Sequence, residues 1–281
     1  PHDLDAPRDP TAGPGATAPP PSAVPPSDRI PLSLPSTRKL GLRGVLKTVL
    51  LNPRLGERYR PLFDALHADG HELGLHGGTD HVVWQRGLDR LDPDALDSLF
   101  RPAYATFVER YGRPAGFASP GFRWNDDVLR LVDRYGFRYA SDMDGEAPFV
   151  PTADGEACDH WQVPVNVAGE AKVPRIEQGL ARGEPVERIV EACVDAIGAR
   201  DFALLYGHPY VEGVHASILD RILEAVKGER EVATVDEYLG RWRERTGRSG
   251  RDDAGAAGRT TEPAPADERP VTEPDGEEPD G

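Results

Sequence analysis

The sequence has little cysteine, little lysine and no long apolar run. Its 281 residues include only two cysteines, Cys158 and Cys193. Two cysteines cannot build a disulfide framework or a four-cysteine zinc ribbon. Cys193 falls on the apolar side of a predicted helix, so we expect a buried free thiol there. No apolar stretch is long enough to span a bilayer, so the sequence predicts no transmembrane segment.

Positive charge is also scarce. Asp and Glu number 48 against 33 Lys and Arg, for a net charge of -15. Such an acidic chain is a poor candidate for binding nucleic acid through charge alone, so we expect no nucleic-acid partner. No glycine-rich loop links a predicted strand to a predicted helix, which argues against a nucleotide-phosphate cradle.

Proline separates the two ends of the chain from its middle. Residues 1–37 hold 11 of the 28 prolines, and residues 251–281 hold five more together with 10 Asp and Glu. Neither end shows the apolar periodicity needed to offset the entropy of ordering. We therefore expect a disordered proline-rich head or loop at 1–37, one folded domain at 38–250 and a disordered acidic tail at 251–281.

Strand and helix patterns alternate through the middle of the chain. Asp92 followed by Pro93 is typical of a helix start, and Asn125 is typical of another. The alternation predicts an α/β fold with parallel strands and crossover helices, as a barrel or as an open sheet. The predicted strands are 71–75, 116–119, 138–141, 161–167, 202–206 and 231–234. The predicted helices are 42–50, 59–66, 93–111, 126–135, 186–197, 218–226 and 238–242.

Two histidines, His76 and His81, flank a short turn sequence. Five residues apart, they cannot share one face of a helix or of a strand. They can converge only if the chain turns between them, and Gly77-Gly78 permits that turn. A converging pair would suit zinc or a similar cation, whereas the alternative reading is two polar loop residues.

Other polar side chains follow predicted strands. Arg123 could hold a carboxylate or phosphate, or be a surface arginine. His208 ends an apolar strand, where it could transfer protons or simply bind a backbone carbonyl. His76, Arg123, Asp142 and His208 each lie at or beyond the carboxyl end of a predicted strand. Because active sites of parallel α/β folds assemble at that edge, the set as a whole favours a catalytic site.

These residues lie in motifs that resemble the polysaccharide deacetylase family, also called the NodB-homology or carbohydrate esterase type four family. Within it, the sequence is most similar to deformylases of lipid-linked 4-deoxy-4-formamido-arabinose. The resemblance runs from about Gly70 to Leu239. It rests on Gly70 to His76, Trp84-Gln85, Gly121-Phe122-Arg123, Arg138 to Asp142, Val163-Pro164-Val165, and His208 with Val211-Glu212-Gly213.

The resemblance implies a fold, a cofactor and roles for several residues. The fold would be a distorted, incomplete (β/α) barrel with disordered ends. His76 and His81 would bind one divalent metal, most simply zinc, together with an Asp, and a second Asp would be the general base. His208 would protonate the leaving amine, and Asp142 would orient it. Arg123 would stand in for the arginine of the family.

A sugar substrate would need contacting side chains near these groups. By the resemblance we expect Trp84, Pro120, Gly121 and Tyr210 to contact it. For Trp84 and Tyr210 the alternative reading is ordinary packing at a loop. The partner would be an aminosugar or polysaccharide, and a polyprenyl-linked sugar is within the expected class.

The Asp pair of the family should lie on a first strand, well upstream of His76. Only Asp3-Leu4-Asp5 has suitable residues, and Pro1 and Pro7 flank it. We therefore expect that the first strand–helix–strand segment is missing from this sequence and that residues 1–37 are a variable loop that follows it.

The leading hypothesis is a metal-dependent hydrolase that removes an acetyl or formyl group from an aminosugar. With the Asp pair absent, an alternative is an inactive pseudoenzyme whose cleft binds a sugar or a partner. A weaker alternative is another metal hydrolase on a similar barrel, such as a cyclic-amide hydrolase. We expect a cytoplasmic protein that can lie peripherally at the membrane.

Overall fold

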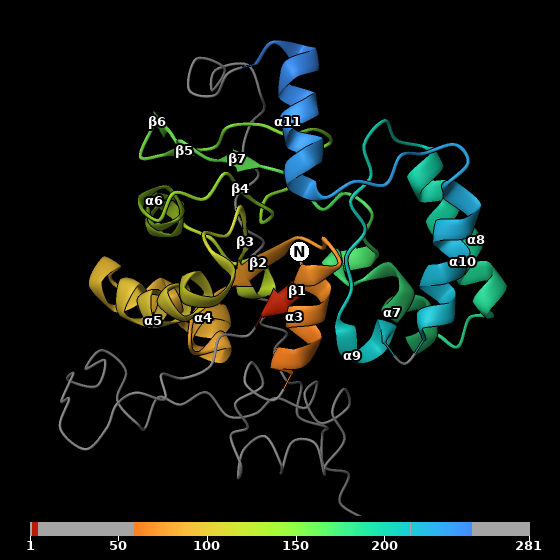
Figure 1. Cartoon of the computed structure of the whole chain (residues 1–281), viewed down its shortest axis with the longest axis horizontal. Helices are drawn as coiled ribbons and strands as arrows, with labels where there is room; N and C mark the ends of the chain where they lie inside the picture. The colour runs from red at the N-terminus through yellow and green to blue at the C-terminus, as the bar shows by residue number, and fades with distance from the viewer. Residues whose placement is uncertain (1, 5–58, 214, 249–281) are drawn as a thin grey trace, which may run out of the picture.

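The structure, a computed structural model, describes residues 2–4, 59–213 and 215–248. At its centre five parallel strands form one sheet in the order β1-β2-β3-β4-β7 (Figure 1). The prediction of an α/β fold with a parallel sheet is confirmed. No pairing among the described residues joins β7 back to β1, so the described strands form an open sheet.

Helices connect and flank the strands. The strands are β1 (His2–Leu4), β2 (Leu73–His76), β3 (Gly116–Ala118), β4 (Tyr139–Ala140), β5 (Thr152–Ala153), β6 (Glu156–Ala157) and β7 (Trp161–Gln162). The α-helices are α3 (Arg60–Ala68), α4 (His81–Gly87), α5 (Pro93–Tyr111), α6 (Asp126–Arg134), α7 (Arg175–Ala181), α8 (Val186–Gly198), α9 (Pro209–Glu212), α10 (Ala216–Val226) and α11 (Val235–Thr246). Short 3₁₀ turns are η2 (Leu88–Arg90), η3 (Pro120–Phe122) and η4 (Glu170–Lys172). Within the described ranges, no helix is both long enough and apolar enough to cross a bilayer.

Strand β1 corrects the expectation that the first strand is missing. Its residues pair in parallel with β2, Asp3 opposite Gly74 and Leu4 opposite Leu75. Because an edge strand hydrogen-bonds to one neighbour only, prolines just outside a three-residue edge strand do not prevent its backbone pairing. The proline-rich composition of the head therefore hid a real strand. Residues 5–37 and 251–281, where the head and the tail were predicted, lie outside the described residues.

An aromatic core supports the first half of the sheet. The fully buried Phe100 of α5 packs edge-on against Phe117 of β3 and against Tyr135 and Phe137. Aromatic pairs in this arrangement stabilise by about 0.5–1.5 kcal/mol each beyond the area that they bury. This core fixes β2 and β3 relative to α5, and thereby the turn between His76 and His81.

Two predicted helix starts are confirmed by their side-chain caps. Asp92 Oδ1 accepts a hydrogen bond of 2.8 Å from the Ala95 amide at the start of α5. Asn125 Oδ1 accepts one of 3.0 Å from the Val128 amide at the start of α6. Each cap satisfies an amide that has no partner within the helix, which is why these residues mark the helix starts.

Two predicted strands are absent from the described sheet. Residues 202–206 make a single bridge, Leu205 with Val167. Beside it, the Asn166 side chain binds the Phe202 carbonyl at 2.8 Å and the Leu204 amide at 2.9 Å, which takes backbone groups away from a ladder. Residues 231–234 lead instead into α11, where Thr234 is the N-cap. The predicted helix 42–50 lies outside the described residues.

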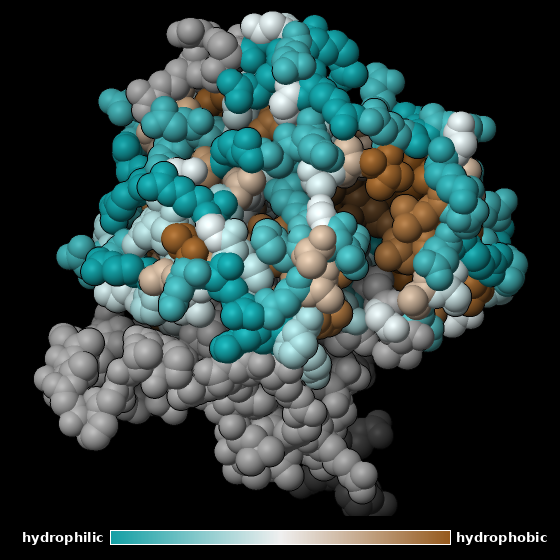
Figure 2. Space-filling view, viewed as in Figure 1, coloured by the Kyte–Doolittle hydropathy of each residue, from teal (hydrophilic) through white to brown (hydrophobic). Residues whose placement is uncertain are grey.

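A second helical layer is formed by α7, α8 and α10. Ile189 and Cys193 of α8 pack with Ile218 and Ile222 of α10. Cys193 is fully buried and free, as predicted. Figure 1 shows these helices on the other side of the molecule from α4 and α5. Figure 2 shows a hollow with apolar side chains beside α8 and α10.

Candidate metal and proton-transfer site

The chain turns sharply after β2, between His76 and His81. Gly77 has φ +71°, and a Cβ atom there would lie 2.5 Å from Pro120 Cγ, so the turn needs glycine. The Thr79 amide then binds the Leu99 carbonyl at 2.9 Å. Asp80 caps α4 by accepting hydrogen bonds from the Val82 and Val83 amides at 3.1 and 3.0 Å. His81 is the first residue of that helix.

The turn brings the two histidines together. The Nε2 atoms of His76 and His81 are 3.1 Å apart, and the ring centroids are 5.0 Å apart. His76 Nδ1 lies 3.0 Å from the Ala118 carbonyl oxygen. Because a carbonyl only accepts, Nδ1 must carry the hydrogen, which directs Nε2 at His81. The predicted convergence is thus observed, with the orientation that a metal-binding imidazole needs.

Strand β1 brings a carboxylate-bearing segment to the same edge of the sheet. Its register places Asp3 opposite Gly74, two positions before His76. The last residue of β1, Leu4, pairs with Leu75, so β1 ends beside the end of β2 that carries His76. Asp5 follows Leu4 in the sequence but lies outside the described residues.

His208 has a carboxylate partner that the sequence did not predict. Its Nδ1 hydrogen-bonds to Glu177 Oε1 of α7. The Glu177 side chain is only 10 % exposed, while that of His208 is 32 % exposed. A carboxylate hydrogen-bonded to Nδ1 fixes the orientation of the imidazole ring. The prediction that Asp142 orients His208 is therefore not what the structure shows.

Asp142 is instead buried under the carboxyl end of the sheet. Its Oδ1 accepts a hydrogen bond of 2.5 Å from the Ser119 amide, while Oδ2 has no partner. Burial raises the pKa of Asp142 to about 6, and the Ser119 hydrogen bonds and the charge of His76 oppose that rise. The Asp142 and Met143 amides are bound by Gln162 Oε1 of β7.

Arg123 follows η3 and faces a surface acid. Its Nη2 donates to Asp89 Oδ2 at 2.6 Å, and Asp89 is largely exposed. Its Nε is buried without a hydrogen-bond partner. The predicted catalytic role of Arg123 thus stays a prediction, because its guanidinium is paired with Asp89 here.

The predicted sugar contacts divide into three groups. Trp84 is fully buried among Phe100 and Phe117, so its prediction as a sugar platform is wrong and the packing alternative holds. Pro120 is buried against Gly77, and Gly121, with φ +64°, is exposed beside Gln85. Tyr210 lies in α9, and its side chain is not among those described.

Lys172, Tyr206 and Phe122 contact one another beside Asp142. Lys172 Nζ lies 3.4 Å from the Asp142 carbonyl, 3.0 Å from Asp144 Oδ1 and 4.8 Å from the centre of the Phe122 ring. Tyr206 donates a hydrogen bond to the Lys172 carbonyl and packs edge-on against Phe122. The scarcity of lysine could have drawn attention to Lys172. Glu177 gives no local signal.

Backbone strain gathers around these side chains. Phe122, Ala171 and Lys172 have φ angles of +57°, +51° and +56°. They are three of the four non-glycine residues with positive φ in the described part of the chain, the other being Asp154. Strain of this kind is concentrated at functional sites, where surrounding contacts hold it in place.

A second cluster of metal-capable side chains joins α6 to the segment before β7. Asp133, Cys158 and His160 offer ligand atoms within 4.8 Å of one another. Asp133 Oδ1 accepts from His160 Nδ1 at 2.6 Å and from the Asp159 and His160 amides at 3.0 Å. Burial and the nearby Asp133 raise the pKa of Cys158 to about 12. Asp133 is thus already hydrogen-bonded, whereas His160 Nε2 is buried without a hydrogen-bond partner among the described residues.

Comparisons with known proteins agree with the motifs. No family model matches the chain. Over 105 residues it is 33 % identical to the "Probable 4-deoxy-4-formamido-L-arabinose-phosphoundecaprenol deformylase ArnD" of Shewanella sediminis, covering 37 % of this chain and 34 % of that protein. A protein of the same name from Wigglesworthia glossinidia brevipalpis is 31 % identical over 99 residues, or 34 % of each chain. The match thus spans about a third of the length of these relatives.

A solved structure shows the fold. A crystal structure assigned as a polysaccharide deacetylase from Mycobacterium smegmatis aligns with a TM-score of 0.54. The alignment covers 70 % of this chain and 71 % of that chain at 20 % identity. The chain shares this fold, and its resemblance to polysaccharide deacetylases and to the arabinose deformylases is confirmed.

Proposed function

We propose that this chain carries the catalytic site of a metal-dependent amide hydrolase that removes a formyl or acetyl group from an aminosugar. The observation that carries the proposal is the 3.1 Å approach of the His76 and His81 Nε2 atoms at the carboxyl end of β2. The relatives named as deformylases and the fold shared with a polysaccharide deacetylase support the reaction class. We further propose that the sheet belongs to an incomplete, distorted barrel.

The donor set fits a divalent cation. Two Nε2 atoms that face each other at 3.1 Å must share a proton, and a cation can take the place of that proton. The Ala118 carbonyl holds the His76 ring by Nδ1, as in many zinc sites. His76, His81 and one carboxylate of Asp3-Leu4-Asp5 would hold the ion, and zinc suits this mixture of nitrogen and oxygen.

The segment Asp3-Leu4-Asp5 would supply a general base as well as a metal ligand. A divalent cation, when bound, polarises the amide carbonyl and makes water a better nucleophile. Of Asp3 and Asp5, the one that does not bind the ion would take the proton from the attacking water. Strand β1 removes the main argument for an inactive pseudoenzyme, which was the apparent absence of this strand.

His208 would serve as the general acid. The amine leaves readily only when its nitrogen is protonated, and the contact of Nδ1 with Glu177 would orient the His208 ring for this proton transfer. Glu177 takes the orienting role, while Asp142 stays buried beneath the site. Arg123, Pro120, Gly121 and Tyr210 keep their predicted roles within this proposal.

The substrate class follows from the relatives. Their printed names describe deformylation of a 4-formamido-arabinose carried on phosphoundecaprenol. A polyprenyl-linked aminosugar is therefore the first substrate to try. Such a substrate would bring a cytoplasmic enzyme to the membrane surface.

The test is release of free amine from N-formyl and N-acetyl aminosugars by zinc-reconstituted protein. We expect amine release from at least one of the two, abolished in His76→Ala and kept in the control His215→Ala, whose histidine is exposed at the start of α10. No amine release from either substrate by folded, zinc-loaded protein would contradict the proposal.

A further inference from the structure

One peptide group joins the candidate metal site to the buried Asp142. It is the peptide bond between Ala118, the last residue of β3, and Ser119. Its carbonyl oxygen accepts a hydrogen bond from His76 Nδ1 at 3.0 Å, and its N–H donates to Asp142 Oδ1 at 2.5 Å. Because the peptide bond is conjugated, a change at its N–H end alters the electron density at its oxygen.

The Ala118 carbonyl serves two donors at once. It accepts from the Gly77 amide at 3.1 Å, which continues the pairing of β2 with β3, and from the His76 ring. Both lone pairs of the oxygen are therefore in use. The strength of the bond to His76 then depends on how much electron density the oxygen carries.

The Asp142 carboxylate adds electron density to that oxygen. A hydrogen bond to a charged acceptor is roughly twice as strong as a neutral one, and it draws the Ser119 amide proton toward the carboxylate. Ser119 and Asp142 are both buried, and in such an interior successive hydrogen bonds polarise one another. A stronger acceptor on Nδ1 makes the imidazole a more basic ligand through its other nitrogen. For His76 that nitrogen is Nε2, which faces His81.

The backbone around Asp142 fixes its place beside the end of β3. The Ser141 amide donates to the Phe117 carbonyl at 3.0 Å, and the Asp142 amide donates to Gln162 Oε1 at 3.0 Å. These bonds would hold an asparagine equally well. Asp142 Oδ2 has no hydrogen-bond partner among the described residues, so its buried charge opposes folding. A charge kept at this cost points to a role outside folding.

We propose that Asp142 is a positioning residue for the metal ligand His76 and acts through the Ala118–Ser119 peptide group. Its carboxylate strengthens the bond that keeps the hydrogen of His76 on Nδ1, so that Nε2 keeps its lone pair for the cation. The ligand role of His76 rests on the proposed function, whereas the chain of hydrogen bonds from His76 to Asp142 does not.

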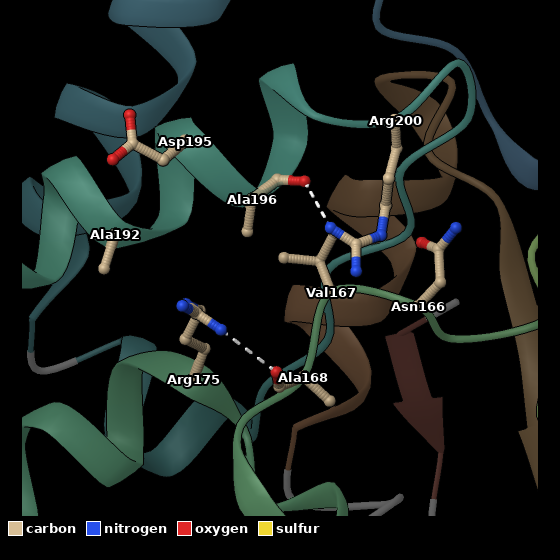
Figure 3. A pocket seen from close by; sticks show the side chains of 8 residues that line it. All are labelled: Asn166, Val167, Ala168, Arg175, Ala192, Asp195, Ala196 and Arg200. Atoms are coloured by element: carbon tan, nitrogen blue, oxygen red, sulfur yellow. Dashed lines mark hydrogen bonds between the residues drawn. The ribbon is translucent and has the colours of Figure 1, made fainter.

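A matched control variant lies in another part of the molecule. Asp195 of α8 lines a cavity between α8 and the segment that follows β7 (Figure 3), and its side chain is exposed. None of the residues that line this cavity belongs to the chain of hydrogen bonds from His76 to Asp142. Asp195→Asn therefore removes the same charge as Asp142→Asn and leaves the Ala118–Ser119 peptide group untouched.

The zinc affinity of the full chain, measured by competition with a chelator, tests the proposal. At about pH 8 the Asp142 carboxyl, whose pKa burial raises to about 6, is ionised. We expect Asp142→Asn to weaken zinc binding by about tenfold, the lower end of the loss typical for outer partners of metal-binding histidines. Asp195→Asn should bind zinc like the unmodified protein. Urea unfolding of the zinc-free proteins should show Asp142→Asn to be at least as stable as the unmodified protein, which separates lost affinity from lost folding.

NMR of zinc-free protein with nitrogen-15-labelled histidine tests the same chain of hydrogen bonds without metal. The Nδ1–H proton of His76, identified by its loss in His76→Ala, should move upfield in Asp142→Asn and stay in place in Asp195→Asn. If the unmodified protein binds no zinc, the proposed function fails and this proton shift alone decides whether Asp142 acts on His76. The inference is overturned if Asp142→Asn keeps both the zinc affinity and the His76 proton shift of Asp195→Asn.

Discussion

Two clusters in this protein contain residues that bind metals, and they differ in what their atoms already bind. His76 and His81 present two Nε2 atoms to each other at 3.1 Å at the edge of the sheet. In the other cluster, Asp133 accepts hydrogen bonds from His160 Nδ1 and from two backbone amides. The first arrangement can exchange a proton for a cation. In the second, a cation would have to displace the hydrogen bonds that Asp133 already accepts, and only His160 Nε2 is buried without a partner among the described residues.

The comparison shows that ligand types alone do not identify a metal site. Asp, Cys and His are all good zinc ligands, yet burial and the nearby Asp133 raise the pKa of Cys158 to about 12, so zinc binding there would have to displace a tightly held thiol proton. What distinguishes the His76–His81 pair is its position at the carboxyl edge of parallel strands, beside the strand of Asp3.

The largest expected effect concerns His208, which we assign to proton transfer and not to metal binding. His208→Ala should lower kcat/KM for amide hydrolysis by about 10²- to 10⁴-fold, because it removes the general acid. Its metal content should not change. Glu177→Gln should give a smaller loss, because it replaces a charge-assisted hydrogen bond that orients His208 with a neutral one. Equal activity of His208→Ala and the unmodified protein would remove His208 from the mechanism.

Removing the hydrogen bonds that Asp133 accepts should lower the stability of the protein but not its metal content. Asp133→Ala removes the acceptor of His160 Nδ1 and of two amides, so we expect a loss of about 2–4 kcal/mol in the free energy of unfolding. Urea unfolding measures it. A loss of bound zinc in the folded variant would instead assign the metal to this cluster.

Asp142 is fully buried just after β4. Burial raises its pKa in the folded protein from 3.8 to about 6. A raised carboxyl pKa contributes stability that is complete below about pH 4 and is lost as the pH rises through about 6. Asp142→Asn should remove this loss and raise the unfolding free energy at pH 7 by about 2–3 kcal/mol.

The matching measurement is unfolding free energy against pH for both proteins. The unmodified protein should lose stability between about pH 4 and pH 6 relative to Asp142→Asn. Parallel curves for the two proteins would show that Asp142 titrates normally.

The smallest expected effect concerns the helix that positions His81. Asp80→Ala removes the N-cap of α4, and we expect a loss of about 1 kcal/mol in the free energy of unfolding. Asp80→Asn keeps an acceptor and is the matched control. If the pair of histidines depends on the cap, zinc affinity should fall in Asp80→Ala and recover in Asp80→Asn.

Local signals explain what could be predicted from the sequence. The caps Asp92 and Asn125 act within three residues, so the sequence alone reveals them. The convergence of His76 and His81 followed from the glycines between them. In each case the cause and its effect lie within a few residues.

Contacts between distant segments explain what could not be predicted. Glu177 and His208 are 31 residues apart and meet only through the packing of α7 near α9. The sequence predicts that Trp84 contacts the sugar, yet Trp84 is buried in the core beside Phe100 and Phe117. The sequence did not reveal strand β1 because the high proline content is an average over residues 1–37. An edge strand needs only three suitable residues within such a segment.

Metal content tests the central claim most directly. Zinc-reconstituted protein should hold one zinc per chain by atomic absorption, the His76→Ala/His81→Ala double variant should hold none, and Cys158→Ser should hold one. Zinc retained in the double variant but lost in Cys158→Ser would contradict the account and place the metal in the buried Asp133–Cys158–His160 cluster.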